Sequence, residues 1–180
     1  ITKITKTDVA YAKAYNSVIK LIGRTRMQAD GKIQCTVAPM LVSKNSPLSM
    51  VDDVFNAIMV RGDATGDVMF YGKGAGKLPT ASAVMADMID CVKHLNARKY
   101  VFWDDGATDY VADCGLEEMA VYVHAKAANT QKAYEEINGL FGCVEVLDYP
   151  DAPAHEIAFI TPKATLSEIE GKIKQLSMEI

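Results

Sequence analysis

The sequence predicts an α+β protein, in which a small, mostly antiparallel sheet with covering helices is followed by a βαββα unit. Two strand-like runs, residues 18–27 and 33–42, flank an Asp-Gly pair that is typical of a hairpin turn. A long helical pattern begins only after a glycine-rich stretch near residue 75. From residue 118 onward, short strand-like and helix-like segments follow one another.

The composition is that of a folded globular protein. Of the 180 residues, 49% are hydrophobic, which is ample for a packed core. The net charge is −4, and basic residues are scattered among acidic ones, so neither nucleic acid nor an anionic membrane surface is expected as a partner. No apolar run approaches the length of a membrane span, and the first six residues lack signal-peptide character, so we expect a cytoplasmic protein. The opening in mid-pattern favours a piece of a larger protein.

The cysteines and histidines give no sign of a metal site. The four cysteines, Cys35, Cys91, Cys114 and Cys143, are far apart and form no Cys-x-x-Cys pair. We therefore expect buried free thiols rather than disulfides or a metal centre. The three histidines, His94, His124 and His155, have no cysteine or carboxylate at ligand spacing, so no metal is expected and the histidines are interpreted as structural.

The first 73 residues are predicted to form one helix and four strands. Cap residues at 5–8 precede a helical pattern, which predicts a short helix over about 7–17. The strands are expected at 18–27, 33–42, 55–61 and 68–73. Pro39 cannot donate a ladder hydrogen bond, so it belongs at an edge or a bulge. Together these strands are predicted to make the small antiparallel sheet.

The most informative stretch runs from Met69 to Val84. Strand formers are followed by three glycines, and Pro79 and Thr80 then open a helical stripe that reaches about residue 95. The N–H groups of such a first helical turn can hold an anion or a polar cofactor group, and glycine lets the ligand approach closely. The spacing fits neither the dinucleotide fingerprint nor the P-loop. A binding turn and a tight structural turn therefore both remain open.

The last third of the chain has the order of a split βαβ fold of the ferredoxin-like type. Strands are expected at 119–125, 143–149 and 156–160, and helices at 129–141 and 165–176. A short strand is expected at 100–103, and the polar stretch at 104–109 is predicted to be a loop and the domain boundary. The predicted organisation is a first domain at 1–97, a linker at 98–117 and a second domain at 118–180.

The run from Gly62 to Gly76, which continues through 79–84 to Asp87, closely resembles homoserine dehydrogenase. Further matches follow the order of that family, at residues 1–5, 19–23, 47–48 and 55–57. The resemblance covers roughly the first half of the chain. It implies that residues 1–97 are the C-terminal part of the catalytic and dimerisation domain, with the helix that returns to the nucleotide-binding domain.

The resemblance implies a parent oxidoreductase that interconverts L-aspartate 4-semialdehyde and L-homoserine with NADP or NAD, in threonine and methionine biosynthesis. It places Gly74, Ala75, Gly76 and Thr80 beside the nicotinamide end of the cofactor, with close-packed backbone as the alternative. The family's nucleotide-binding domain and acid–base lysine belong upstream of the point that matches residue 1. No catalytic residue is therefore expected here, and the 180 residues are expected to be inactive alone and to bind the cofactor only weakly. The family's sheet also builds its dimer, so we expect a homodimer or a higher homo-oligomer.

In this context residues 118–180 resemble an ACT domain, the amino-acid-sensing module that follows the catalytic part in many homoserine dehydrogenases. ACT domains usually bind their effector at an acidic-x-Pro-Gly turn after the first strand, whereas this chain has the sequence Lys-Ala-Ala-Asn-Thr at 126–130. We therefore expect weak or absent threonine binding and a role in dimer contacts. The alternative is a freestanding amino-acid-binding or assembly module without catalysis.

Overall fold

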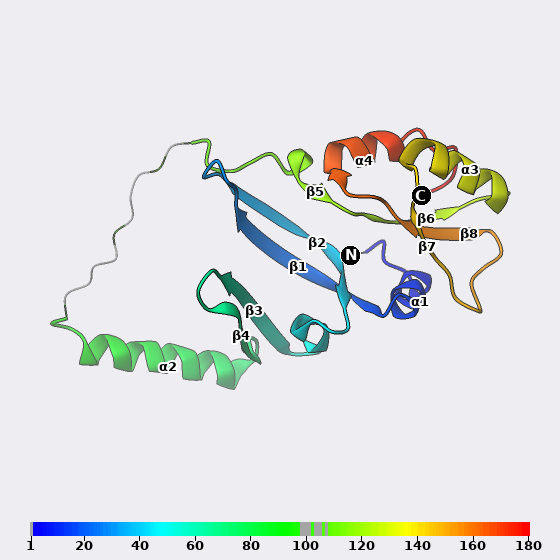
Figure 1. The fold of residues 1–180 in the computed structure, drawn as a ribbon. Coiled ribbons are helices and arrows are strands. Elements are labelled where there is room, and N and C mark those ends of the chain that lie inside the picture. The colour runs from blue at the N-terminus through cyan, green and yellow to red at the C-terminus, as the bar shows by residue number, and fades with distance from the viewer. Residues whose placement is uncertain (1, 98–101, 103–105, 107) are drawn as a thin grey trace. The chain divides into compact units, whose positions relative to one another are not determined.

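The computed structural model describes residues 2–97, 102, 106 and 108–180. It has an α+β fold, with α-helices and small antiparallel sheets (Figure 1). The chain divides into two compact units, residues 1–43 with 107–180, and residues 44–106. The strand predicted at 100–103 and most of the loop predicted at 104–109 lie outside the described residues, and the predicted domain boundaries at 97 and 117 stay a prediction.

The first unit begins with α1 (Lys6–Ala14), whose start is fixed by a capping box. The hydroxyl of Thr5 accepts a hydrogen bond from the backbone N–H of Asp8 at 3.2 Å. The carboxylate of Asp8 in turn accepts one from the backbone N–H of Thr5 at 2.6 Å. Two of the N–H groups that a helix start leaves unpaired are thus satisfied. The helix ends before residue 17, where it was predicted to end, because Asn16 has a φ of 50° and leaves the helical conformation.

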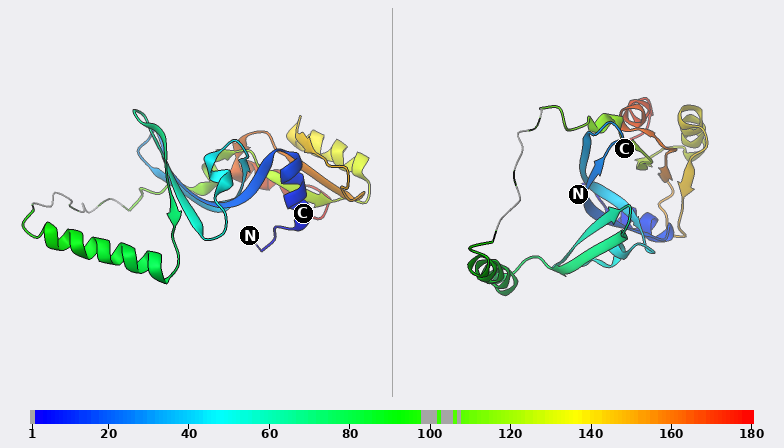
Figure 2. Two further views of the ribbon diagram at one scale, coloured as in Figure 1. Left: turned by 90° about the horizontal axis from the view of Figure 1, so that it is seen from below. Right: turned by 60° about the vertical axis from the view of Figure 1, so that its left-hand side comes forward.

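The hairpin predicted next is confirmed. Strands β1 (Ser17–Met27) and β2 (Ile33–Ser43) pair antiparallel along their whole length, from Ser17 opposite Ser43 to Met27 opposite Ile33. They form a long two-stranded ribbon (Figures 1 and 2). Since both strands of such a ribbon are edge strands, Pro39 lies on an edge, as predicted.

The rest of the first unit contains a three-stranded antiparallel sheet in the order β6–β8–β7. The elements of this part of the chain are, in order, the 3-10 turn η2 (Cys114–Leu116), β5 (Glu118–Met119), β6 (Tyr122–Lys126), α3 (Thr130–Phe141), β7 (Glu145–Leu147), β8 (Glu156–Ile160), β9 (Ala164–Thr165) and α4 (Leu166–Ile173). The single strand predicted at 119–125 is wrong, because the chain changes partner at Val121. There the backbone exchanges hydrogen bonds with Thr161, so β5 pairs with β9 whereas β6 pairs with β8.

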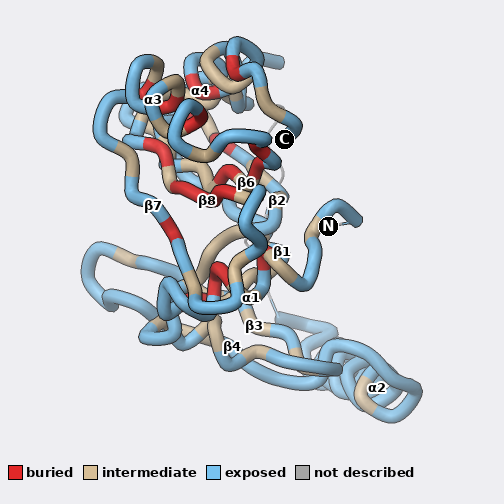
Figure 3. The backbone as a smooth tube through the Cα atoms, turned by 90° about the vertical axis from the view of Figure 1, so that its right-hand side faces the viewer, coloured by how far each residue is buried: buried red, intermediate tan, exposed pale blue. Residues whose placement is uncertain are grey.

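The sheet β6–β8–β7 is covered on both faces. Successive strand residues point to opposite faces, and in β8 Ile157 and Phe159 face the core formed with α3 and α4, whereas Ala158 faces α1. On that second face the ring of Tyr11, which is 1% exposed, packs with Leu147 and Ala158. Burial on both sides explains why β8 is nearly continuously apolar, and Figure 3 shows the buried residues gathered along β6 and β8.

The second unit consists of the 3-10 turn η1 (Pro47–Met50), β3 (Phe55–Gly62), β4 (Gly66–Lys73) and α2 (Lys77–Lys93). The predicted strand pair is confirmed, with Phe55 opposite Lys73 and Gly62 opposite Gly66. It is not joined to β1–β2, so the single four-stranded sheet that the sequence predicted is instead two separate ribbons. Each ribbon is made by strands that a short turn connects, and such local turns do not specify pairing with a more distant strand.

Two further observations concern exposure. The four cysteines are free, as predicted, but all four are exposed, so the prediction of buried thiols is wrong. Cys35 lies on β2, a strand of a two-stranded ribbon, and Cys91 lies on α2, a helix in which no residue is buried. None of the helices in the described residues is long and apolar enough to span a membrane.

Candidate functional site

The predicted site lies in the turn between β4 and α2. Gly74, Ala75 and Gly76 connect the last strand residue, Lys73, to the first helical residue, Lys77. The predicted order of strand, glycine turn and helix is therefore confirmed. Thr80 stands in the first turn of the helix, where its backbone N–H donates to the carbonyl of Gly76 at 3.1 Å.

The backbone of Gly76 explains why glycine is needed there. Its φ is 118° and its ψ is 152°, a region that residues with a side chain rarely enter. Gly76 is also the N-cap of α2, and no side chain caps this helix start. The first N–H groups of α2 are thus available to an anion or a polar ligand group.

The space beside Gly76 is bounded, in the described residues, by the ring of Pro79. A β-carbon built there would have only ring carbons of Pro79 within 4 Å, the nearer one at 3.4 Å. Because glycine has no side chain, a polar group could approach the backbone here more closely than at another residue. Lys73 and Lys77 are both exposed and flank the turn, which adds positive charge to the partial positive charge of the helix start.

Gly74 has a different requirement. A β-carbon built at Gly74 would fall against the side chain of Asn56, with the amide carbon only 2.9 Å away and the amide nitrogen closer still. Asn56 lies opposite Gly72 in the β3–β4 ribbon, so its side chain covers the end of β4. Gly74 is therefore constrained by the Asn56 side chain, whereas a β-carbon at Gly76 would meet only the Pro79 ring among the described residues. The cofactor contact of either glycine stays a prediction.

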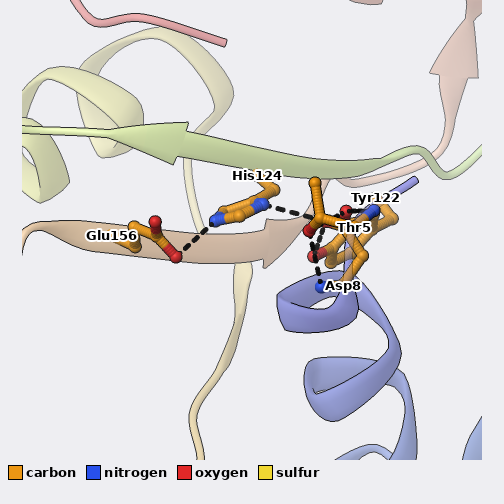
Figure 4. Close-up of polar contacts among 5 residues, drawn as sticks. All are labelled: Thr5, Asp8, Tyr122, His124 and Glu156. Carbon is orange, nitrogen blue, oxygen red and sulfur yellow. Dashed lines mark hydrogen bonds and ion pairs between the residues drawn. The ribbon is translucent and has the colours of Figure 1, made fainter. Parts of the chain in front are cut away.

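A second polar site, which the sequence did not predict, lies between α1 and the sheet β6–β8–β7 (Figure 4). Nδ1 of His124 lies 2.8 Å from a carboxylate oxygen of Asp8, and its Nε2 lies 3.1 Å from a carboxylate oxygen of Glu156. The hydroxyl of Tyr122 donates to the same Asp8 oxygen at 2.9 Å, and the hydroxyl of Thr5 donates to the other at 2.6 Å. We call these five residues the Asp8–His124 cluster.

The cluster is shielded from solvent. The side chains of Asp8, His124 and Glu156 are 6%, 17% and 18% exposed, and the rings of Tyr11 and His124 pack edge to face with their centroids 5.5 Å apart. Burial raises the pKa of the Asp8 carboxyl, but hydrogen bonds from Thr5 and Tyr122 and the nearby His124 outweigh it, so the net pKa lies below its usual value. Asp8 is therefore a carboxylate at neutral pH.

The sequence carried two signals for this cluster. Thr5 and Asp8 have the three-residue spacing of a capping box, and Tyr122 and His124 have the two-residue spacing that puts both on one face of a strand. Neither signal says that the two elements meet, because 116 residues separate Asp8 from His124. His94 and His155 lie at the end of α2 and in the loop before β8, where the sequence placed them. Among the residues that the structure describes, no three His, Cys, Asp or Glu side chains gather to hold a metal ion.

Comparison with known proteins identifies one family. The family model described as homoserine dehydrogenase matches residues 1–89. The homoserine dehydrogenase of Bacillus subtilis is 43% identical over 96 residues, which are 53% of this chain and 22% of that protein. That of Mycobacterium bovis is 33% identical over 156 residues, which are 81% of this chain and 34% of that protein.

Solved structures extend the likeness to nearly the whole chain. A homoserine dehydrogenase from Thiobacillus denitrificans superposes with a TM-score of 0.78 at 25% identity, over 98% of this chain and 42% of that one. The enzyme from S. aureus at pH 6.0 gives 0.73 at 30% identity, over 99% of this chain and 44% of that one. The chain thus spans less than half the length of these relatives.

Proposed function

The chain belongs to the homoserine dehydrogenase family, and on that premise we propose that it is the C-terminal portion of a cytoplasmic enzyme that interconverts L-aspartate 4-semialdehyde and L-homoserine. The observation that carries this proposal is the family match over residues 1–89, which ends within α2 and contains the whole glycine turn. Bound NADPH or NADH would supply the hydride. The described residues contribute part of the cofactor site and not the chemical step.

Within that site we assign Gly76 the main contact with the nicotinamide end of the cofactor, next to Ala75 and Thr80. The space beside Gly76, which only the Pro79 ring bounds among the described residues, and the uncapped start of α2 support this assignment. Gly74 has no β-carbon, which leaves room for the side chain of Asn56 beside the turn. No group here is assigned to proton transfer.

A chimaera tests this function. Residues 1–89 would replace the matching segment of the B. subtilis homoserine dehydrogenase. We expect the chimaera to bind NADPH, measured by cofactor fluorescence, and to reduce aspartate semialdehyde, whereas the 180 residues alone show no turnover because hydride transfer needs a positioned cofactor and an acid. A folded chimaera that binds no cofactor would contradict the proposal, as would turnover by the 180 residues alone.

Gly76→Val in this chimaera is expected to weaken cofactor binding at least about tenfold, because a branched side chain fills the space beside the turn. The matched control is Gly76→Ala. Both substitutions place a β-carbon at a φ of 118°, where the β-branched valine is the more strained, so the difference in cofactor affinity between them reports the effect of branching at the β-carbon. Equal affinities for the two variants would make Gly76 a purely structural glycine.

For the last third of the chain we propose a regulatory, ACT-like role. The supporting observation is the sheet order, in which β8 lies between β6 and β7 and is antiparallel to both. Glu179 also forms a bridge with Lys126 at the free edge of β6. Asn129 caps α3 by accepting from the backbone N–H of Lys132 at 3.0 Å, which engages an N–H group near the turn where ACT domains usually bind an effector. We therefore propose contacts between subunits rather than threonine binding as the main role of this part.

The chain is expected to self-associate. Several apolar side chains of the second unit are more than half exposed, namely Ile58, Phe70, Leu78, Val84, Met88 and Val92. Burying each one is worth about 1.5–3 kcal/mol, so we expect a homodimer or larger in sedimentation equilibrium. Val84→Glu should shift the distribution toward monomer, whereas the control Ala83→Glu, about 100° around α2, should not. A monomeric wild-type chain with α2 ordered would refute this expectation.

A further inference from the structure

His124 lies between two hydrogen-bond acceptors, one on each side of its ring. Its Nδ1 faces Asp8 of α1, and its Nε2 faces Glu156 of β8, at 2.8 and 3.1 Å. Ionised carboxylates only accept hydrogen bonds, and a neutral imidazole carries a single N–H donor. Both contacts are therefore hydrogen bonds only when His124 is an imidazolium. Loss of the proton would leave a nitrogen lone pair facing a carboxylate at one of the two positions.

We propose that the Asp8–His124 cluster is a pH-dependent latch that holds α1 against the sheet β6–β8–β7 and loosens when the imidazole loses its proton. The inference goes beyond the proposed enzyme function and does not depend on it. Asp8 stands on α1 and both His124 and Glu156 stand on the sheet, so the charged imidazole joins the two layers.

Two tyrosines lie beside the imidazole, Tyr11 on α1 and Tyr122 on β6. On α1, burial and neighbouring acidic groups raise the pKa of Tyr11 to about 12, so its phenol stays neutral. On β6, burial and the hydrogen bond to Asp8 raise the pKa of Tyr122, which also stays neutral. Lys126 lies on the same face of β6 as His124, and Asp148 and Tyr149 lie in the connection before β8. Histidine is the side chain that ordinarily changes charge between about pH 5 and 8, so the imidazole is the switching group.

In acid the effect of pH on the cluster has the opposite sign, because stability is lost as the pH falls. Because the pKa of Asp8 in the folded chain lies below its usual value of 3.8, its carboxylate stabilises the fold at pH values above 3.8. That contribution is lost as the pH falls through the lowered pKa. The latch should therefore hold best in the mildly acidic range, and it should weaken toward both strong acid and mild base.

A second group of polar contacts joins the segment before β5 to the β1–β2 ribbon, and it does not involve α1. The buried carboxylate of Glu117, just before β5, forms an ion pair with Arg24 of β1 and accepts a hydrogen bond from Thr36 of β2 at 2.7 Å. Arginine stays charged over the whole range, so these contacts do not respond to mild base. The pH effect should therefore be confined to α1.

Amide hydrogen exchange on the full 180-residue chain tests the latch. Protection factors, corrected for the intrinsic pH dependence of exchange, would be compared at pH 6.0 and 8.5. In the wild type, protection in α1 should fall about tenfold or more at pH 8.5, the factor expected for one charge-assisted hydrogen bond. Protection in α3 should stay unchanged. Equal α1 protection at the two pH values would overturn the proposal.

Two variants should respond in opposite ways. Glu156→Gln supplies an amide that can donate to a neutral Nε2, so α1 should stay protected at both pH values. The glutamine of His124→Gln cannot donate hydrogen bonds to both carboxylates, so α1 should be weakly protected at both pH values. His155→Gln, at an exposed histidine outside the cluster, should keep the wild-type pH dependence. If His124→Gln fails to fold, Glu156→Gln still decides, because a wild-type loss of protection in this variant would refute the latch.

Discussion

Replacing Phe159 by alanine is expected to lower the free energy of unfolding of the first unit by about 3–5 kcal/mol, the usual cost of deleting a buried phenylalanine ring. Phe159 has no exposed surface, and its ring centroid lies 5.9 Å from that of Phe141 on α3. It belongs to the same core cluster as Ile137 and Ile169, so the deletion leaves a cavity between the sheet and both helices. The measurement is urea denaturation followed by circular dichroism.

Val146→Ala is the control for this prediction. Val146 lies on β7 of the same sheet but is 48% exposed, so its truncation should change the free energy of unfolding by no more than about 0.5 kcal/mol. If Phe159→Ala were as mild as Val146→Ala, the core between the sheet and the two helices would not be the main source of stability of this unit.

The elements that the sequence predicted well are those fixed by nearby residues. The β1–β2 hairpin follows from an Asp-Gly turn between two apolar runs, and α3 begins after the cap residue Asn129. The glycine turn at 74–76 belongs to this class, because its strand, glycines and helix are contiguous. The position of the candidate site could therefore be predicted, and its cofactor role stays a prediction.

Features that depend on distant residues could not be predicted from pattern. The sequence gives no reason why the chain should change its pairing partner at Val121, because Thr161, which accepts a hydrogen bond from the backbone N–H of Val121, is 40 residues away. The same is true of the contact between Asp8 and His124, and of the exposure of Cys35 and Cys91. Each depends on which layers cover which faces, and the order of hydrophobic residues along one segment does not contain that information.

Glu117→Ala is expected to destabilise the first unit by about 2–3 kcal/mol, because it removes a charge-assisted contact at a buried position. The side chain of Glu117 is 4% exposed, whereas that of Arg24 is 41% exposed. The cost should stay below the roughly 3–5 kcal/mol of a fully buried pair, since water can still solvate the guanidinium that is left. The backbone carbonyl of Glu117, which accepts from the N–H of Leu166, is untouched by the change.

The neighbouring residue provides the control. Glu118 is exposed and carries the same charge one position away, so Glu118→Ala should change the free energy of unfolding by no more than about 0.5 kcal/mol. Glu117→Gln should fall between the two, because its amide oxygen can still accept from Thr36 while the ion pair is lost. Arg24 and Thr36 stand opposite each other in the β1–β2 ribbon, so one carboxylate reaches both strands at once. Equal effects of Glu117→Ala and Glu118→Ala would show that η2 and β5 are held to the ribbon by other contacts.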